Sequence, residues 1–364
     1  MWAVTGLART YAAIAGTLVV LTICTAALTG SYRRVRSSRA EHHFLEGRAL
    51  STAGKTKEAI EEFRAAMHLA PTNQQYRLEL ATAVAESGLW DEAELRLAEL
   101  RERDPTNALV NLMSARVAAK RARPELASRY YQRAIYGFWP DERDQRRLDA
   151  RLEFIRYLSR AGRPTQILGQ VLETAGETTD PKVRSELAAI LSRHGSPQHA
   201  EELLKEALET DPKSVNLWMQ LGDLFFSRGR FAEAESAFRR ALRLAPRDPA
   251  PLQKLQAASE VRSLDPTQVR LSSRERWARS RQVLQRAIAA LSRCTAVQDT
   301  SLPADISDDL EAAQALLKTR YRRGAEVNEL LEAADRVWAA RQKLCAGTPE
   351  VDEPLTVLMS RIGA

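Results

Sequence analysis

The first candidate for chemistry is the tripeptide Gly54, Lys55 and Thr56, which ends like a phosphate-binding Walker A loop. That loop needs a second glycine five positions before Gly54, and the chain has Ala49 there. It also needs a preceding strand, whereas this tripeptide sits in a predicted turn between two helices. We therefore expect no nucleotide site here.

The histidines are the next candidates, either as metal ligands or as catalytic bases. His42 and His43 are adjacent, so on a helix their side chains point about 100° apart, which disfavours a shared ion. His194 and His199 flank a predicted turn and have no nearby cysteine or matched pair of carboxylates. The sequence contains no G-x-S-x-G, H-E-x-x-H or glycine-rich dinucleotide motif. These observations predict a protein that is not an enzyme and has no catalytic residue, metal, cofactor or small-molecule substrate.

The three cysteines include no C-x2-C pair, so they do not form a zinc-binding pattern. Cys294 and Cys345 each close a predicted helix of an up-down-up bundle. The first and third helices of such a bundle are parallel, so both cysteines would lie at the same end. A Cys294–Cys345 disulfide would imply an oxidising compartment. Two buried free thiols fit the sequence equally well.

Composition sets the scale of the elements that carry these residues. The chain has 364 residues, of which 44% are hydrophobic and 28% charged, enough for one extended array or for two to three compact domains. The net charge of +7 comes from 54 basic and 47 acidic residues. Such a modest excess is common on helical proteins without an anionic partner, so we expect no nucleic acid.

Residues 215–248 form a 34-residue unit around which the chain is organised. Its large and small landmarks are Trp218, Leu221, Gly222, Phe225, Gly229, Ala234, Phe238, Ala241 and Pro246. Their spacing resembles the tetratricopeptide repeat (TPR), which has W-x2-L-G-x2-Y in its first helix and A-x3-F and a proline in its second. One such unit cannot bury its apolar face alone, so neighbouring repeats are required.

Further repeats follow from the same landmarks. Pro71 and Pro105 lie 34 residues apart, as do Pro212 and Pro246. The predicted repeats are 40–73, 74–107, 108–140, 148–180, 181–214 and 215–248, followed by a cap helix at 249–262 with a polar outer face. The resemblance implies an all-α TPR superhelix of about six helix-turn-helix repeats over residues 40–262. It also implies a concave groove lined mainly by the first helix of each pair.

Basic residues recur at groove positions of the first helices: Arg48, Arg116, Lys120, Arg156, Arg160 and Arg193. Aligned cations of this kind would bind an acidic segment or a C-terminal carboxylate of a partner protein. The alternative is that they face water near the C-terminal ends of helices, where the helix dipole favours cations. The lysine and asparagine clamp of chaperone-binding family members is not reproduced, so a chaperone C-terminus is not the expected ligand.

The two ends of the chain lie outside the repeats. Residues 10–32 are uncharged and would form about 34 Å of helix, which predicts a transmembrane anchor within residues 1–39. The arginines after it favour a cytoplasmic repeat domain, and a periplasmic one is the alternative. Residues 263–364 are expected to form a small helical bundle, with a capping box at Ser272 and Glu275 and a second helix beginning at Ser307.

These elements together predict a single-pass membrane protein that presents a TPR scaffold for assembling a membrane-associated complex. Its layout is similar to that of the lipopolysaccharide assembly protein family, although the paired-cysteine metal module of that family is missing. The alternative is an extracytoplasmic binding protein of cell-envelope, secretion or polysaccharide machinery, stabilised by the cysteine bridge. A third is a regulatory module whose activity lies in the C-terminal bundle.

Overall fold

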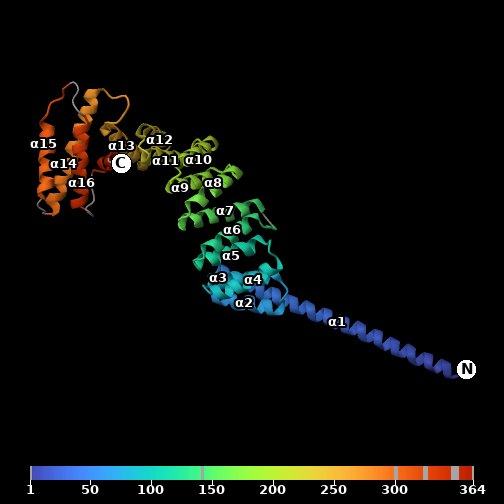
Figure 1. The fold of residues 1–364 in the computed structure, drawn as a ribbon. Helices are drawn as coiled ribbons and strands as arrows, with labels where there is room; N and C mark the ends of the chain where they lie inside the picture. The colour runs from blue at the N-terminus through green and yellow to red at the C-terminus, as the bar shows by residue number, and fades with distance from the viewer. Residues whose placement is uncertain (1, 141–142, 299–301, 323–326, 346–351, 363–364) are drawn as a thin grey trace. The chain divides into compact units, whose positions relative to one another are not determined.

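The computed structural model describes residues 2–140, 143–298, 302–322, 327–345 and 352–362, with side chains described from Leu21 onward. Within these residues the chain forms 17 helices and no strand (Figure 1). The all-α prediction is therefore confirmed for the described residues. Contacts between Cα atoms divide the chain into two compact units, with the division between Gln170 and Val171. This division does not coincide with the domain boundaries predicted near residues 40 and 262.

The first unit consists of antiparallel helix pairs that stack in chain order. Its helices are α1 (Trp2–Thr52), α2 (Thr56–Leu69), α3 (Gln74–Glu86), α4 (Trp90–Arg103), α5 (Ala108–Lys120), α6 (Pro124–Tyr136), α7 (Arg143–Arg160) and the first half of α8 (Pro164–Glu177). Each helix packs against the next, and α3 also packs against α5. The first helices of successive pairs thus lie side by side.

Local sequence explains where the helices begin and turn. The side chains of Asn73 and Asn107 accept hydrogen bonds from backbone N–H groups in the first turns of α3 and α5, and each such cap contributes about 1 kcal/mol. Equivalent caps begin later helices at Asp180, Ser214 and Asp248. The turn inside each pair contains a residue with positive φ, which is a glycine in five turns and Ala122 in the third. Caps and turns therefore recur with the 34-residue period.

Small residues allow the two helices of a pair to approach closely. A Cβ atom at Gly47 would lie 2.7 Å from Cε1 of Phe63, and one at Gly222 would lie 2.6 Å from Cδ1 of Phe238. Both phenylalanines are fully buried. The glycine and phenylalanine of the repeat pattern are thus complementary in shape, because the ring occupies the space that any side chain at the glycine would need.

The third repeat departs from this regular pattern at its end. Phe138 N donates to Thr106 O at 2.8 Å, and Ala108 N donates to Phe138 O at 3.2 Å. These bonds make an isolated bridge between Asn107 and Phe138. They tie the end of α6 to the start of α5, which accounts for the one-residue shift of the repeat's final proline to Pro140.

The prediction that residues 10–32 span a membrane is wrong, because no helix in the described part of the chain is both long and apolar enough to cross one. The segment is the first half of α1, which continues without a break into the first repeat. Residues 21–32 make only about 18 Å of helix, shorter than the hydrocarbon core of about 30 Å. Arg33 and Arg34 follow directly. The side chains of residues 10–20 lie outside the described ones, and the predicted single-pass localisation is not supported.

The second unit begins with the rest of α8 and continues with two further helix pairs. Its other helices are α9 (Pro181–Arg193), α10 (Pro197–Thr210), α11 (Val215–Ser227), α12 (Phe231–Leu244), α13 (Pro249–Leu264), α14 (Ser273–Gln298), α15 (Ala304–Lys318), α16 (Val327–Leu344) and α17 (Glu353–Ile362). Ser272 and Glu275 form the expected capping box at the start of α14. The second predicted start is wrong, because Ser307 N donates to Pro303 O and so lies one turn inside α15.

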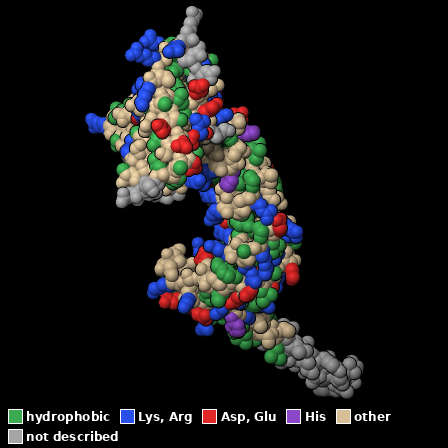
Figure 2. All heavy atoms as spheres, turned by 60° about the vertical axis from the view of Figure 1, so that its left-hand side comes forward, with side chains coloured by type: hydrophobic (Ala, Val, Ile, Leu, Met, Phe, Trp, Pro, Cys, Tyr) green, Lys and Arg blue, Asp and Glu red, His purple; other side chains and the backbone are tan. Residues whose placement is uncertain are grey.

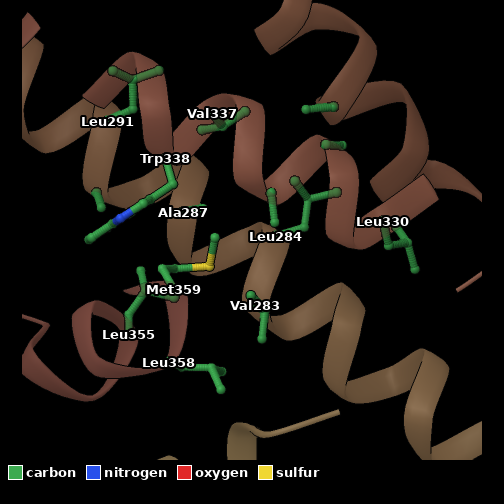
Figure 3. Packing of buried hydrophobic residues seen from close by; sticks show 14 of the residues in the cluster. Val283, Leu284, Ala287, Leu291, Leu330, Val337, Trp338, Leu355, Leu358 and Met359 are labelled. Carbon is green, nitrogen blue, oxygen red and sulfur yellow. The ribbon is translucent and has the colours of Figure 1, made fainter. Parts of the chain in front are cut away.

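One hydrophobic core joins the last repeat to the C-terminal helices. Phe231 of α12, Val261 and Leu264 of α13 belong to the same buried cluster as residues of α14 to α17. Figure 3 shows Leu284, Trp338 and Met359, from three helices, pointing toward one another in this cluster. Helix α13 therefore does not present a solvated end, as a cap helix would, but continues the packing into the C-terminal helices.

Two specific contacts hold the C-terminal helices in place. Arg361 of α17 donates from Nη1 to Gly229 O at 3.0 Å, and its guanidinium lies 5.7 Å from the ring centre of Phe231. Cys294 and Cys345 are joined by a disulfide, with their Cα atoms 6.3 Å apart. The bond links the last turn of α14 to the residue that follows α16.

Candidate binding groove of the first unit

The predicted groove residues belong to the first helices of the pairs. Arg116 and Lys120 lie on α5, Arg156 and Arg160 lie on α7, and all four side chains reach solvent. They occupy the last two turns of their helices, where the 34-residue frame places groove positions. The structure brings these four residues together in one unit.

Arg116 is the residue that links α5 to α7. Its Nε and Nη2 atoms donate to the two carboxylate oxygens of Glu153 at 2.8 and 2.7 Å. Tyr131 of α6 donates its hydroxyl to Glu153 Oε1 at 3.0 Å. Bidentate arginine–carboxylate pairs are among the strongest side-chain hydrogen bonds, so this Arg116–Glu153–Tyr131 network fixes the floor of the groove. Arg116 is thus committed to an internal partner.

The electrostatics of this network favour its charged form. Burial alone would raise the pKa of Glu153, but the hydrogen bonds and charge of Arg116 outweigh it and hold the pKa below its usual value. The hydrogen bonds to Glu153 raise the pKa of Arg116. Burial raises the pKa of Tyr131 well above its ordinary value, and the carboxylate of Glu153 raises it further. Glu153 is therefore ionised and Tyr131 is neutral near neutral pH.

Replacing Glu153 with Gln is expected to lower the free energy of unfolding by about 2 kcal/mol at neutral pH, because charged hydrogen bonds to Arg116 are lost. The pKa of Glu153 is depressed on folding, so its stabilisation is present above the unfolded-state pKa of about 4.3 and is lost as the pH falls through the native value. Chemical denaturation of both proteins over a pH series measures this. A stability difference that stays constant down to the most acidic point would contradict the assignment.

Lys120 and Arg160 close one side of a hollow of about 480 Å³ between α5 and α7. Tyr157 and Arg163 also line it. Arg163 pairs with Glu125 at 2.7 Å, and Arg160 donates to a main-chain carbonyl of its own helix. Within the described residues no carboxylate lies within ion-pair distance of Lys120. Two cations at the edge of an open hollow can receive an anionic group from outside.

Acidic residues interrupt the predicted stripe of cations toward the N-terminal end of the unit. Glu79 and Glu86 of α3 lie between Arg48 of α1 and the α5 residues. Burial raises the pKa of Glu79, while the charge of Arg48 acts in the opposite direction. Figure 2 shows basic and acidic side chains interspersed on the face that it presents. The cationic part of the first unit's groove is therefore confined to α5 and α7.

Arg193, the sixth predicted residue, belongs to the second unit. It lines a separate hollow of about 320 Å³, whose walls are mostly the small and apolar residues of α9, α10 and α11. Asp223 lies on the opposite wall and pairs with Lys254 of α13 at 2.9 Å. This hollow carries charges of both signs and differs in character from the one at Lys120 and Arg160.

Sequence reasoning missed two residues of the first hollow. Tyr157 lies one turn beyond Glu153 on α7, and Arg163 follows the glycine turn after that helix. Burial raises the pKa of Tyr157, and Arg163 acts in the opposite direction. The repeat frame counts groove positions only within first helices, so it could have found Tyr157 by helical spacing but not a turn residue such as Arg163.

The Walker-like tripeptide has an ordinary structural role. Gly54 has a φ of +74° in the turn between α1 and α2, and Lys55 pairs with Glu58 at 3.5 Å. No strand precedes this turn in the described chain, so the backbone amides do not form a phosphate cradle.

Comparison with known proteins supports the repeat assignment. Residues 50–138 and 186–249 match models of the tetratricopeptide repeat family. No curated protein is similar enough to this chain to count as a relative. The matched segments cover both units and include most of the helix pairs described above.

Several solved structures are similar at low sequence identity. YrrB, a TPR protein with an unusual peptide-binding site, is 14% identical, with a TM-score of 0.40 over 53% of this chain and 97% of its own. PilW, a type IV pilus biogenesis factor, is 14% identical, with a TM-score of 0.41 over 60% of this chain and 98% of its own. The C-terminal part of a TPR protein from Cytophaga hutchinsonii is 14% identical, with a TM-score of 0.46 over 86% of this chain and 99% of its own.

These structural likenesses are too distant to bear on ligand or pathway. The family models carry the assignment, and they agree with the caps, turns and glycine–phenylalanine contacts seen in the helix pairs. TPR proteins are generally non-enzymatic scaffolds. This chain is therefore built on tetratricopeptide repeats, which mediate binding between proteins.

Proposed function

We propose that this protein is a scaffold that binds a partner protein through an acidic segment or a C-terminal carboxylate. The segment would lie in the hollow between α5 and α7 of the first unit. The observation that carries the proposal is the position of Lys120 and Arg160 at the edge of a hollow of about 480 Å³. Carboxylates bind such cations through charge-assisted hydrogen bonds.

The internal network supports this assignment of roles. Arg116 is neutralised by Glu153, so it orders the groove floor rather than binding the partner. Lys120 and Arg160 end their helices, where the dipole also favours a cation without any partner. The two explanations differ in one consequence: only a binding role makes these side chains necessary for partner capture.

Site-specific crosslinking tests the proposal in intact cells. A photoreactive amino acid at position 157 faces the hollow, and one at position 136 on α6 serves as the exposed control. We expect position 157 to capture a defined protein that position 136 does not. In a Lys120→Glu, Arg160→Glu background that capture should fall by about tenfold or more, because two attractions become repulsions.

A matched variant controls for the change in net charge. Lys57→Glu with Arg129→Glu alters two exposed cations on the second helices α2 and α6 by the same total charge. Capture at position 157 should survive this change. Equal capture by both double variants, with helicity retained, would show that Lys120 and Arg160 do not bind the partner.

A further inference from the structure

A second group of side chains, distant in sequence from the hollow, lies where α1 packs on α2. One ligand atom each from His42, His43 and Glu46 lies within 4.8 Å of the others. His42 and Glu46 are four residues apart and His43 and Glu46 are three apart, so both imidazoles flank one carboxylate on the helix surface. The two rings do diverge, at 89° with centroids 6.0 Å apart, but the carboxylate occupies the space between them.

A carboxylate from the neighbouring helix orients one of these imidazoles. Nδ1 of His43 lies 2.6 Å from Oε2 of Glu62 on α2. With the Nδ1–H group donating to Glu62, the tautomer of His43 leaves Nε2 unprotonated and available as a ligand. Metal-binding histidines almost always have such a second hydrogen bond, which fixes the ring and increases its basicity. His43 and Glu62 are both only partly exposed, which restricts their rotamers.

We propose that His42, His43 and Glu46 bind one divalent transition-metal ion of the zinc class, with Glu62 as the positioning residue for His43. Two imidazole nitrogens and one carboxylate oxygen match the ligand preference of Zn²⁺ and related ions, whereas Mg²⁺ and Ca²⁺ prefer all-oxygen sites. His42 and Glu46 are largely exposed, so water can fill the remaining coordination position. The site is independent of the proposed peptide hollow.

Calorimetric titration of zinc chloride into the untagged, chelator-treated full chain tests the site. A Cys24→Ser background removes the exposed free thiol, which would bind zinc on its own. We expect one equivalent of zinc to bind. His42→Ala with His43→Ala should abolish that binding, and Glu46→Gln should weaken it by about tenfold or more.

Glu62 needs a readout that separates positioning from ligation. Glu62→Gln should lower zinc affinity by about tenfold while the cobalt-substituted protein keeps its ligand-field absorption, because the three ligands remain. His199→Ala, on α10, is the matched control and should leave binding unchanged. Circular dichroism verifies that each variant is folded. Absence of saturable zinc binding by the parent protein, or equal binding by the folded His42 and His43 double variant, would overturn the proposal.

Discussion

Removal of the Cys294–Cys345 disulfide is expected to lower the free energy of unfolding of the second unit by about 4 kcal/mol. The bond closes a loop with a sequence separation of 51, and the chain entropy that it removes from the unfolded state grows with loop length. Both cysteines are buried, and they join helices α14 and α16 of the shared core. Loss of the bond therefore acts on the whole C-terminal packing.

Denaturant unfolding of the oxidised protein, the reduced protein and a Cys294→Ala, Cys345→Ala variant measures this effect. The two forms without the bond should unfold at similar, lower denaturant concentrations. Cys24→Ser should unfold like the parent, because Cys24 is free and exposed. If alkylation without reductant labels Cys294 and Cys345 in the native protein, the pair is not bridged and the expected stabilisation is absent.

Gly222→Ala is expected to destabilise the second unit by about 2 kcal/mol. The new Cβ atom would lie 2.6 Å from Cδ1 of Phe238, whose ring is fully buried and has no room to move. Overpacking of this kind costs about 3 kcal/mol, and the better helix propensity of alanine returns about 1 kcal/mol. Thermal or denaturant unfolding of the variant gives the net effect.

Gly169→Ala is the matched control for this substitution. Gly169 also lies inside a helix, α8, but nothing lies within 4 Å of its would-be Cβ atom. Alanine there should leave stability unchanged or raise it by up to about 1 kcal/mol. Two equal effects at positions 169 and 222 would show that the close contact with Phe238 does not decide the cost.

The repeat frame could be predicted from sequence because its signals are local and repeat together. Asn73 and Asn107 end successive repeats and cap the helices that follow, and Gly54 and Gly88 supply the turns between paired helices. Each repeat therefore states its own boundaries. The third was harder to place, because Ala122 replaces the turn glycine and the bridge at Phe138 shifts its end.

Features that depend on distant packing were not predictable in the same way. The apolar stretch before Arg33 suggested a membrane span, since its composition does not reveal that α1 continues as one helix to Thr52. The C-terminal helices were expected to form a separate bundle, because no local signal shows that Phe231 and Val261 share their core.

The groove shows the same limit for charge. Sequence spacing placed Arg116 and Lys120 on one helix face but could not show that Arg116 is paired across to Glu153 and that Lys120 is not. It likewise expected His42 and His43 to diverge without revealing that Glu46 and Glu62 gather around them. Which charges neutralise one another depends on contacts between helices.

Titration of short fluorescent peptides into the full chain tests the central claim most directly. The account predicts that a peptide with an acidic C-terminal end and a free carboxylate binds the parent protein. Affinity should fall by about tenfold or more in the Lys120→Glu, Arg160→Glu variant and should weaken with added salt. The Lys57→Glu, Arg129→Glu variant should bind like the parent. Equal affinity of both variants for that peptide, or equal binding of a basic peptide of the same length by the parent, would contradict the account.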